Sequence, residues 1–442
     1  MVFNGGQRRG GGGGDSGFGG RSRGGGRGGR GGRGRGGGGG GRGYNAHQLG
    51  NETCRNYLLG KCEFGGHRPC RFPHFVKKIG ETRGHSGPVK DVVMWPARQQ
   101  LFTAGGDSVV KLWDCASWQE LTTLSVAATG APASGSGSGV GFGSGSGSRA
   151  GDKDKTEGVG AMVLEGPFLF VGFEAPFPCN SKVSVGMIRG WNLEAGGPTF
   201  EFRASDAMPF AHPTNVMALA VATDPRGGAT LFSGSADGSI RYWQLDPTTN
   251  EFKCRGVLEG HVRGVTRLKT FVLGSTPVLA SASVDTTIRL WDLSTYQCVH
   301  VLGSEDVGHS EPVMDLEFWV SNGETFLISG GLDAEIIVWR MAPPFQLEFQ
   351  ETQDSQVTSL CGTQDAAQTP ILLVGTADGA ITVKELPTFA YKTTYAQNAN
   401  YGHQDAVRRI ATGPMNTFFS VGNDRKMIAW QITGDASAIQ PK

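Results

Sequence analysis

The sequence predicts an all-β protein, a seven-bladed β-propeller in which similar four-stranded sheets repeat around a ring. Two observations predict this fold. At five places an aspartate precedes a tryptophan by six residues, and each tryptophan ends a stretch that alternates as a strand does. The copies also recur every 45 to 52 residues between positions 191 and 430, which is close to the length of one blade.

The clearest copy of the repeat is the stretch 283–293, which reads SVDTTIRLWDL. A turn aspartate and small residues are followed by an alternating strand that ends in Trp-Asp. The five aspartate–tryptophan pairs are Asp107 and Trp113, Asp237 and Trp243, Asp285 and Trp291, Asp333 and Trp339, and Asp424 and Trp430. Two further copies are degenerate, because Trp191 lacks a Gly-His pair before it and Lys384 stands where a tryptophan is expected.

The first 43 residues are almost entirely glycine and arginine. Because they offer so few apolar side chains for burial, we expect residues 1–43 to form a disordered tail. Arginine guanidinium groups can pair with phosphate oxygens and stack on exposed bases. The segment resembles the RGG boxes of RNA-associated proteins, which implies an RNA partner. A solvated spacer without a partner is the alternative.

The net charge of +1 is unevenly distributed along the chain. Residues 1–50 carry +8 and residues 51–78 carry +4, so the remaining residues carry −11. A basic front is therefore joined to an acidic body. No apolar run follows Met1, and no stretch of 18 apolar residues occurs. We expect a protein that is neither secreted nor in a membrane, located in the nucleus, the cytoplasm or both.

A cluster of thiols and one imidazole follows the tail. Cys54, Cys62, Cys70 and His74 have the spacing C-x7-C-x7-C-x3-H, and this ligand set suits tetrahedral zinc in a closed structural site. A segment this short needs metal binding to fold, worth on the order of 10 kcal/mol in finger peptides. His67 is a competing ligand. The other five cysteines are scattered one per repeat, and we expect them to be reduced: Cys115, Cys179, Cys254, Cys298 and Cys361.

The spacing resembles that of the CCCH zinc fingers, although about five residues more often separate the second and third cysteines of that family. The resemblance implies that three aromatic side chains stack on single-stranded bases: Tyr57, Phe64 and Phe72. Four basic residues are candidates for phosphate contacts: Arg55, Lys61, Arg68 and Arg71. The alternatives are that an aromatic ring packs around the zinc and that the basic side chains are solvated.

The ring is predicted to close between the two ends of the propeller. The run from Phe75 to Ile79 is strand-like, whereas the residues after Ile432 form a poor strand. We therefore infer that residues 75–82 supply the outer strand of the last blade, which removes free sheet edges. The predicted organisation is a tail (1–43), a finger (51–76), a propeller (75–433) with a flexible Gly/Ser insertion (129–158), and a C-terminal tail (434–442).

The histidines that precede the blades resemble those of WD-repeat proteins. In that family the histidine binds the turn aspartate and helps to hold the tryptophan, so the resemblance implies a structural network. Its members here, besides the five aspartate–tryptophan pairs, are His85, His261, His309 and His403, with His212 as a weaker match.

No pattern in the sequence assembles a catalytic site or a small-molecule site, so we do not expect an enzyme. The order of tail, finger and repeats resembles the plant-type family that joins one CCCH finger to WD repeats. This resemblance implies an adaptor that binds single-stranded RNA and docks proteins on its propeller. One alternative is a ubiquitin-ligase substrate receptor, although the basic residue expected two positions after Trp-Asp is absent here. The other is a DNA-binding transcriptional regulator.

Overall fold

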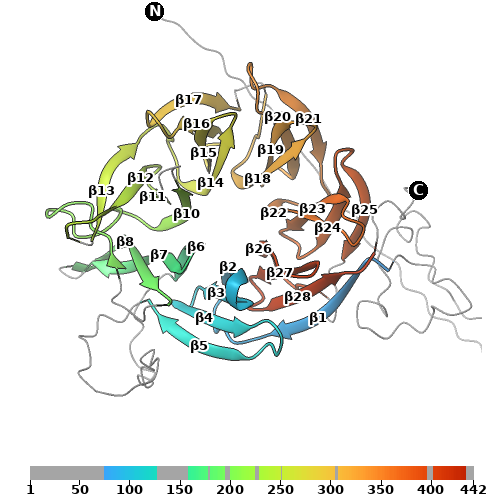
Figure 1. The fold of residues 1–442 in the computed structure, drawn as a ribbon, viewed down its shortest axis with the longest axis horizontal. Helices are drawn as coiled ribbons and strands as arrows, with labels where there is room; N and C mark the ends of the chain where they lie inside the picture. The colour runs from blue at the N-terminus through green and yellow to red at the C-terminus, as the bar shows by residue number, and fades with distance from the viewer. Residues whose placement is uncertain are drawn as a thin grey trace, which may run out of the picture. The chain divides into compact units, whose positions relative to one another are not determined.

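The computed structural model describes residues 74–126, 158–177, 180–194, 200–223, 228–249, 251–303, 307–395 and 402–434. The chain divides into two units, Met1–Asn45 and Ala46–Lys442, and all the described residues belong to the second. They form seven four-stranded antiparallel sheets, and Figure 1 shows these sheets arranged as blades around a central axis. The predicted seven-bladed propeller is therefore confirmed.

The first four blades run in chain order, each from its innermost strand to its outermost. Blade 1 contains β2 (Val89–Trp95), β3 (Gln100–Gly105), β4 (Val109–Asp114) and β5 (Glu120–Ser125), with the 3-10 helix η1 (Pro96–Arg98) after β2. Blade 2 contains β6 (Val159–Glu165), β7 (Phe168–Phe177), β8 (Asn180–Asn192) and β9 (Phe200–Glu201). Blade 3 contains β10 (Val216–Thr223), β11 (Ala229–Ser235), β12 (Ile240–Asp246) and β13 (Glu251–Leu258). Blade 4 contains β14 (Val265–Leu273), β15 (Thr276–Ser283), β16 (Ile288–Asp292) and β17 (Gln297–Leu302).

The last three blades complete the ring. Blade 5 contains β18 (Val313–Ser321), β19 (Glu324–Gly331), β20 (Glu335–Arg340) and β21 (Leu347–Thr352). Blade 6 contains β22 (Val357–Gln364), β23 (Pro370–Thr376), β24 (Ile381–Glu385) and β25 (Ala390–Tyr395). Blade 7 contains β26 (Val407–Thr412), β27 (Thr417–Gly422) and β28 (Met427–Ile432), with β1 (Val76–Thr82) as its outer strand. Among the residues described, no helix has the length and hydropathy needed to span a membrane.

The hydrophobic core lies between neighbouring blades. One cluster, for example, joins Ala280 and Leu290 of blade 4 to Leu316, Leu327 and Trp339 of blade 5. Each middle strand buries side chains on both of its faces against the sheets beside it, which explains why the middle strands are nearly continuous apolar runs. The repeated tryptophans fill the largest of these spaces, and those at positions 243, 291 and 430 are at most 2% exposed.

Blade 7 is built from both ends of the propeller. Strand β1 pairs with β28 in antiparallel register from Val76 opposite Ile432 to Thr82 opposite Met427. The carbonyl oxygen of Phe75 accepts hydrogen bonds from the backbone nitrogens of Thr433 (2.8 Å) and Gly434 (3.1 Å). The prediction that the segment before the first blade closes the ring is therefore confirmed.

The innermost strand of each described blade contains a β-bulge after its first valine. The register shifts between Val89 and Asp91 in β2 and between Val265 and Arg267 in β14, and the other five first strands shift at the equivalent place. A bulge adds twist and redirects the side chain beside it. In blades 1, 4 and 7 the second residue after this valine, Asp91, Arg267 or Arg409, lines the cavity of the central channel.

Candidate functional site

Blade 4 contains a buried hydrogen-bonded chain that starts at the turn aspartate. The Nδ1 atom of His261 lies 2.8 Å from Oδ2 of Asp285, and its Nε2 atom lies 2.8 Å from Oγ of Ser281. The indole nitrogen of Trp291 donates to the same Oγ at 2.9 Å. Because a carboxylate can only accept, Nδ1 of His261 is the donor to Asp285. The chain ties the turn, the loop before the blade and two strands together.

Blades 1, 5 and 7 repeat this chain with similar distances. The histidine Nδ1 lies 2.9 to 3.0 Å from the aspartate, the histidine Nε2 lies 2.8 Å from a hydroxyl oxygen, and the tryptophan donates to that hydroxyl at 2.7 to 2.9 Å. The residues are His85, Asp107, Thr103 and Trp113; His309, Asp333, Ser329 and Trp339; and His403, Asp424, Ser420 and Trp430. The structure thus brings the histidines, aspartates and tryptophans of the sequence pattern together.

The hydroxyl residue at the centre of each chain was missed in the sequence, although a signal for it exists. A serine or threonine stands ten residues before the tryptophan in blades 1, 3, 4, 5 and 7. Blade 3 keeps that contact, with Trp243 donating to Ser233 at 2.8 Å. The Nδ1 atom of its histidine, His212, is 3.8 Å from Asp237 and 3.2 Å from Oγ of Ser239, and the Nε2 atom lies 2.7 Å from Oγ of Ser233.

Blade 6 replaces the chain with an ion pair. Gln353, Val374 and Lys384 occupy the positions of the histidine, the hydroxyl residue and the tryptophan. The side chain of Lys384 is almost fully buried, and its Nζ lies 2.8 Å from Glu351 on β21 of the neighbouring blade. The sequence identified the substitution but not the carboxylate that makes it tolerable. Blade 2 keeps Trp191 in the core but has Val171 in place of the hydroxyl residue.

The turn aspartates make the propeller sensitive to acid. Burial would raise the pKa of the Asp285 carboxyl, but hydrogen bonds from His261 and Thr287 outweigh burial and hold the pKa well below its ordinary value. A pKa lower in the folded state than in the unfolded state stabilises the fold above the unfolded value, near 3.9. This stabilisation is lost as the pH falls through the folded value. Asp107, Asp333 and Asp424 have lowered pKa values as well, so they act in the same direction.

We therefore predict that the free energy of unfolding is nearly constant from about pH 7 to pH 5 and falls below about pH 4. Asp285→Asn removes one of these carboxylates, so the free energy of unfolding of the variant should fall less steeply as the pH decreases below about 4. Urea unfolding at a series of pH values, followed by tryptophan fluorescence, measures the slope. Asp354→Asn, at an exposed loop position, is the matched control. An acid limb equally steep in Asp285→Asn and in the control would contradict the assignment.

Most residues of the predicted zinc finger lie outside the described residues. This is true of Cys54, Cys62, Cys70 and His67, and of every predicted nucleic-acid contact: Arg55, Tyr57, Lys61, Phe64, Arg68, Arg71 and Phe72. The fourth predicted ligand, His74, is described and directly precedes Phe75, which is fully buried in blade 7. Within the described ranges no group of three or more His, Cys, Asp or Glu side chains is placed to hold a metal ion. The predicted N-terminal tail, the C-terminal tail apart from Gly434 and the Gly/Ser insertion apart from Gly158 are also outside these ranges.

Four of the five scattered cysteines are described, and all four are free thiols: Cys115, Cys254, Cys298 and Cys361. Cys179 lies outside the described residues. Burial raises the pKa of Cys115 to about 11 and that of Cys361 to about 12. Because the thiolate is the reactive form of cysteine, these two thiols are poor nucleophiles at neutral pH.

The central channel contains a ring of charged residues that the sequence analysis missed. Arg409 of blade 7 places its Nε 3.1 Å from Asp91 of blade 1 and its Nη1 3.1 Å from Asp315 of blade 5. Arg267 of blade 4 lies 2.9 Å from the other oxygen of Asp315. All four stand at the second position after the first valine of their blades. The sequence signal for these residues is the pattern Val-x-Asp or Val-x-Arg, whose valine lies four residues after the repeated histidine.

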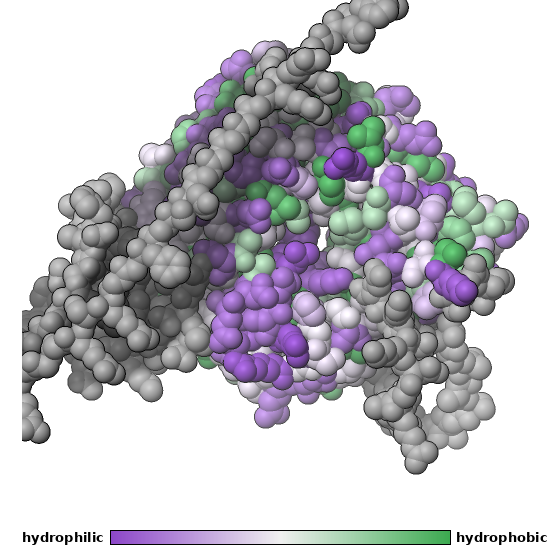
Figure 2. Space-filling view, turned by 180° about the vertical axis from the view of Figure 1, so that it is seen from behind, coloured by the Kyte–Doolittle hydropathy of each residue, from purple (hydrophilic) through white to green (hydrophobic). Residues whose placement is uncertain are grey.

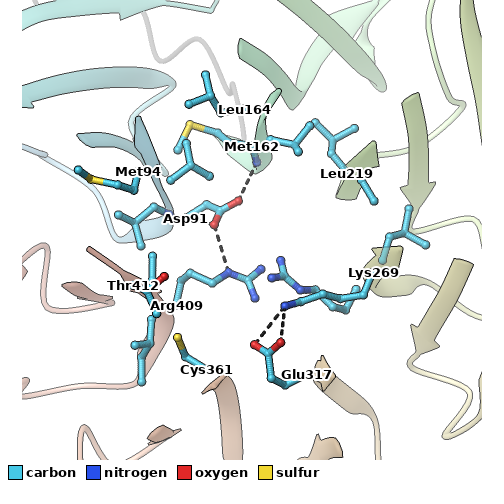
Figure 3. Close-up of a pocket in the computed structure, with 18 of the residues that line it drawn as sticks. Asp91, Met94, Met162, Leu164, Leu219, Lys269, Glu317, Cys361, Arg409 and Thr412 are labelled. Atoms are coloured by element: carbon cyan, nitrogen blue, oxygen red, sulfur yellow. Dashed lines mark hydrogen bonds and ion pairs between the residues drawn. The ribbon is translucent and has the colours of Figure 1, made fainter. Parts of the chain in front are cut away.

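A second layer of the channel contains an ion pair between Lys269 and Glu317, with Nζ–O distances of 3.0 and 3.1 Å. Both residues and Arg409 line a cavity of about 710 Å³. Figure 3 shows the side chain of Arg409 extending from Asp91 toward this pair across the centre of the channel. Ion pairs between first strands therefore connect blades that are not neighbours in the ring.

Comparison with known proteins agrees with this geometry. The family model described as "WD domain, G-beta repeat" matches residues 76–114, 207–244, 252–292 and 296–340. The chain therefore contains WD repeats at these ranges. The matched ranges start at residue 76, the last residue of the predicted finger, and include the aspartate–tryptophan pairs of blades 1, 3, 4 and 5. WD-repeat propellers are scaffold folds, and here the histidines and aspartates of the repeats are committed to contacts within the blades.

Relatives of this chain are found among plant proteins named for a zinc finger. "Zinc finger CCCH domain-containing protein 17" of Oryza sativa subsp. japonica is 29% identical over 88% of this chain and 75% of its own length. "Zinc finger CCCH domain-containing protein 48" of Arabidopsis thaliana is 28% identical over the same shares of the two chains. The resemblance to a family that joins a CCCH finger to WD repeats is therefore confirmed. Repeats and relatives together support a protein-interaction adaptor.

Proposed function

We propose that this WD-repeat protein is a zinc-dependent RNA-binding adaptor. The observation that carries the proposal is the junction at His74. The last predicted zinc ligand is followed at once by Phe75, whose side chain is fully buried and whose carbonyl is hydrogen-bonded to the end of blade 7. A finger that ends at His74 is attached to the propeller without a flexible spacer. RNA held by the finger would thus have a defined position relative to a protein on the propeller.

The predicted ligand residues of the finger suit zinc. Three cysteines and one histidine provide the sulfur and nitrogen ligands of a structural zinc site, and four such ligands leave no open position for substrate. When bound, the metal would supply the free energy that folds this short segment. Cys54, Cys62, Cys70 and His74 would hold it. The names of the plant relatives support the same reading.

RNA is proposed as the nucleic-acid partner because aromatic and basic residues alternate with the predicted ligands. Tyr57, Phe64 and Phe72 would stack on unpaired bases, and Arg55, Lys61, Arg68 and Arg71 would contact phosphates. The arginine-rich residues 1–43 would add contacts without sequence preference. We propose the nucleus or the cytoplasm as the compartment, where RNA and protein partners are both available.

Cys70→Ser tests the proposal in the full-length protein. We expect stoichiometric zinc to be lost, and the affinity for single-stranded RNA to fall at least about tenfold because the stacking aromatics lose their frame. Elemental analysis gives the zinc content, and fluorescence anisotropy with a labelled oligonucleotide gives the affinity. Cys298→Ser, which changes a free thiol in blade 4, is the matched control. Unchanged RNA affinity in a zinc-free Cys70→Ser protein would refute the role of the finger.

The same assay separates the contributions of tail and finger and the DNA alternative. Each phosphate contact to a single strand adds about −0.7 to the slope of log affinity against log salt concentration. Deletion of residues 1–43 should therefore flatten this slope, whereas an unchanged slope removes the tail from the mechanism. A duplex DNA competitor that displaces the RNA at equal concentration would favour the transcriptional alternative.

A further inference from the structure

The channel opens into the cavity of about 710 Å³ on the side where the loops joining the first and second strands of the blades lie. We call this opening the channel mouth. Its floor consists of charged side chains: Asp91, Arg267, Lys269, Glu317 and Arg409. Its rim includes the apolar side chains of Met94, Pro96, Leu164, Val221 and Pro414. Figure 2 shows an opening near the centre of the ring, with hydrophilic residues beside it.

The carboxylates at the floor are already engaged by donors of the protein itself. Every carboxylate oxygen of Asp91 and Glu317, and of Asp315, which pairs with Arg267 and Arg409, accepts a hydrogen bond or lies in an ion pair with a described residue. Several of these donors are backbone nitrogens of the first strands, so the carboxylates are fixed against the channel wall. Each of these oxygens therefore already has a donor within the protein, which leaves less acceptor capacity for a cation.

The donors of the floor are not saturated. Arg267 forms one ion pair, in which its Nε lies 2.9 Å from Oδ1 of Asp315. The geometry of this contact is not that of a hydrogen bond. Among the described residues, none accepts from the two terminal nitrogens of Arg267, although its side chain is only 19% exposed. Burial and the adjacent charge of Arg409 lower the pKa of this guanidinium. The terminal edge of Arg267, which lines the cavity, is a pair of parallel donors available to a ligand.

The chemistry of the cavity selects among anions. Three cations and three carboxylates balance around the floor, and Glu165 adds a further carboxylate to the cavity lining, so among anions a ligand with a single negative charge is tolerated best. The two terminal N–H groups of a guanidinium match the two oxygens of a carboxylate. Exposed apolar side chains near the loops of the same side, Val272 (63%), Val320 (65%) and Met415 (79%), provide surface for a polypeptide.

We propose that the channel mouth binds a carboxylate of a protein partner, held by the terminal nitrogens of Arg267. The carboxylate is an acidic side chain or a chain terminus that enters from the side of the apolar rim. This inference rests on the proposed adaptor function, because it names the chemistry with which the propeller recognises its protein partner. Arg267 is the residue that determines specificity, whereas Arg409 is held by Asp91 and Asp315 within the fold.

Two matched peptides test the site on the full-length protein. The probes are N-acetyl-Leu-Glu-Leu-amide, whose glutamate is its one charge, and the same peptide with glutamine. Thermal unfolding at increasing peptide concentration gives an apparent Kd, because a ligand of the folded state raises the unfolding temperature. We expect the glutamate peptide to bind at least about tenfold more tightly than the glutamine peptide. Equal affinities, or no saturable effect of either peptide below about 10 mM, would overturn the proposal.

Arg267→Gln should remove the preference for glutamate, and Arg267→Lys should weaken it, because a lysine keeps the charge but cannot donate two parallel hydrogen bonds. Unfolding temperatures without peptide establish that both variants fold. Full preference for glutamate in either variant overturns the assignment to Arg267. An N-acetyl-tripeptide with a free C-terminal carboxylate distinguishes a chain terminus from a side chain.

Inorganic phosphate and the RNA assay complete the test. Saturable binding of phosphate together with no preference for the glutamate peptide would overturn the proposal in favour of a phosphate ligand. Because Arg267 is distant in sequence from the finger, the affinity of Arg267→Gln for single-stranded RNA should be unchanged. Failure of the channel-mouth site and failure of the RNA-binding proposal are therefore separate results.

Discussion

Asp315→Ala is expected to lower the free energy of unfolding by about 3–5 kcal/mol, the usual cost of removing one partner from a buried ion pair. The side chain of Asp315 is fully buried and contacts Arg267 and Arg409. It also accepts hydrogen bonds from the backbone nitrogens of Leu316 and Leu360, each at 2.9 Å. Its removal leaves two guanidinium groups facing each other in the channel. Urea unfolding at neutral pH measures the loss.

Two further variants show how much of the lost stability is due to the charge of Asp315. Asp315→Asn keeps the shape and one acceptor oxygen but removes the charge, so it should lie between Asp315→Ala and the unchanged protein. Asp354→Ala, at an exposed position, should change stability by less than about 0.5 kcal/mol. If Asp315→Ala costs no more than this control, the charged ring does not stabilise the propeller.

Phe75→Ala is expected to cost about 3–5 kcal/mol, the range found when a buried phenylalanine is truncated. The ring of Phe75 is fully buried in a cluster with Phe418, Trp430 and Ile432, between blades 6 and 7. The cavity would open beside the strand pair that closes the propeller. Fluorescence of the buried tryptophans during urea unfolding reports the effect.

Leu121→Ala is the control for this prediction, because Leu121 lies on the outer strand of blade 1 and is 50% exposed. Its cost should be less than about 1 kcal/mol, in proportion to the smaller apolar area that it buries. Similar losses for the two variants would show that Phe75 is not part of the closing core. The zinc content of Phe75→Ala should be unchanged, which separates closure from metal binding.

The repeats could be predicted from the sequence because each blade carries its own signal. The turn aspartate and the tryptophan of blade 4 lie six residues apart, and the strand between them alternates. The closing strand could also be predicted, because the run at Phe75 had no partner of its own and the last blade lacked an outer strand. These inferences need only local pattern and the rule that sheet edges are covered.

The charged ring in the channel could not be predicted in the same way. Arg409 and Asp91 are 318 residues apart, and they meet only because blades 7 and 1 are neighbours in the closed ring. Asp315 of blade 5 contacts Arg409 of blade 7 across the channel. Lys384 and Glu351 illustrate the same difficulty on a smaller scale, since their ion pair joins two blades. Contacts of this kind depend on how the blades are arranged, which no single repeat specifies.

The pairing of β1 with β28 also determines when the protein can be completed during synthesis. Strand β1 leaves the ribosome before any of the blades, yet its hydrogen-bonding partner is the last strand of the seventh. Until residues 427–432 emerge, a nascent chain holds an unpaired strand at its front and an open edge behind it, and such edges invite wrong pairing. Assembly of the ring is thus delayed until translation has passed its final blade, and slow closure follows from contacts of such long sequence separation.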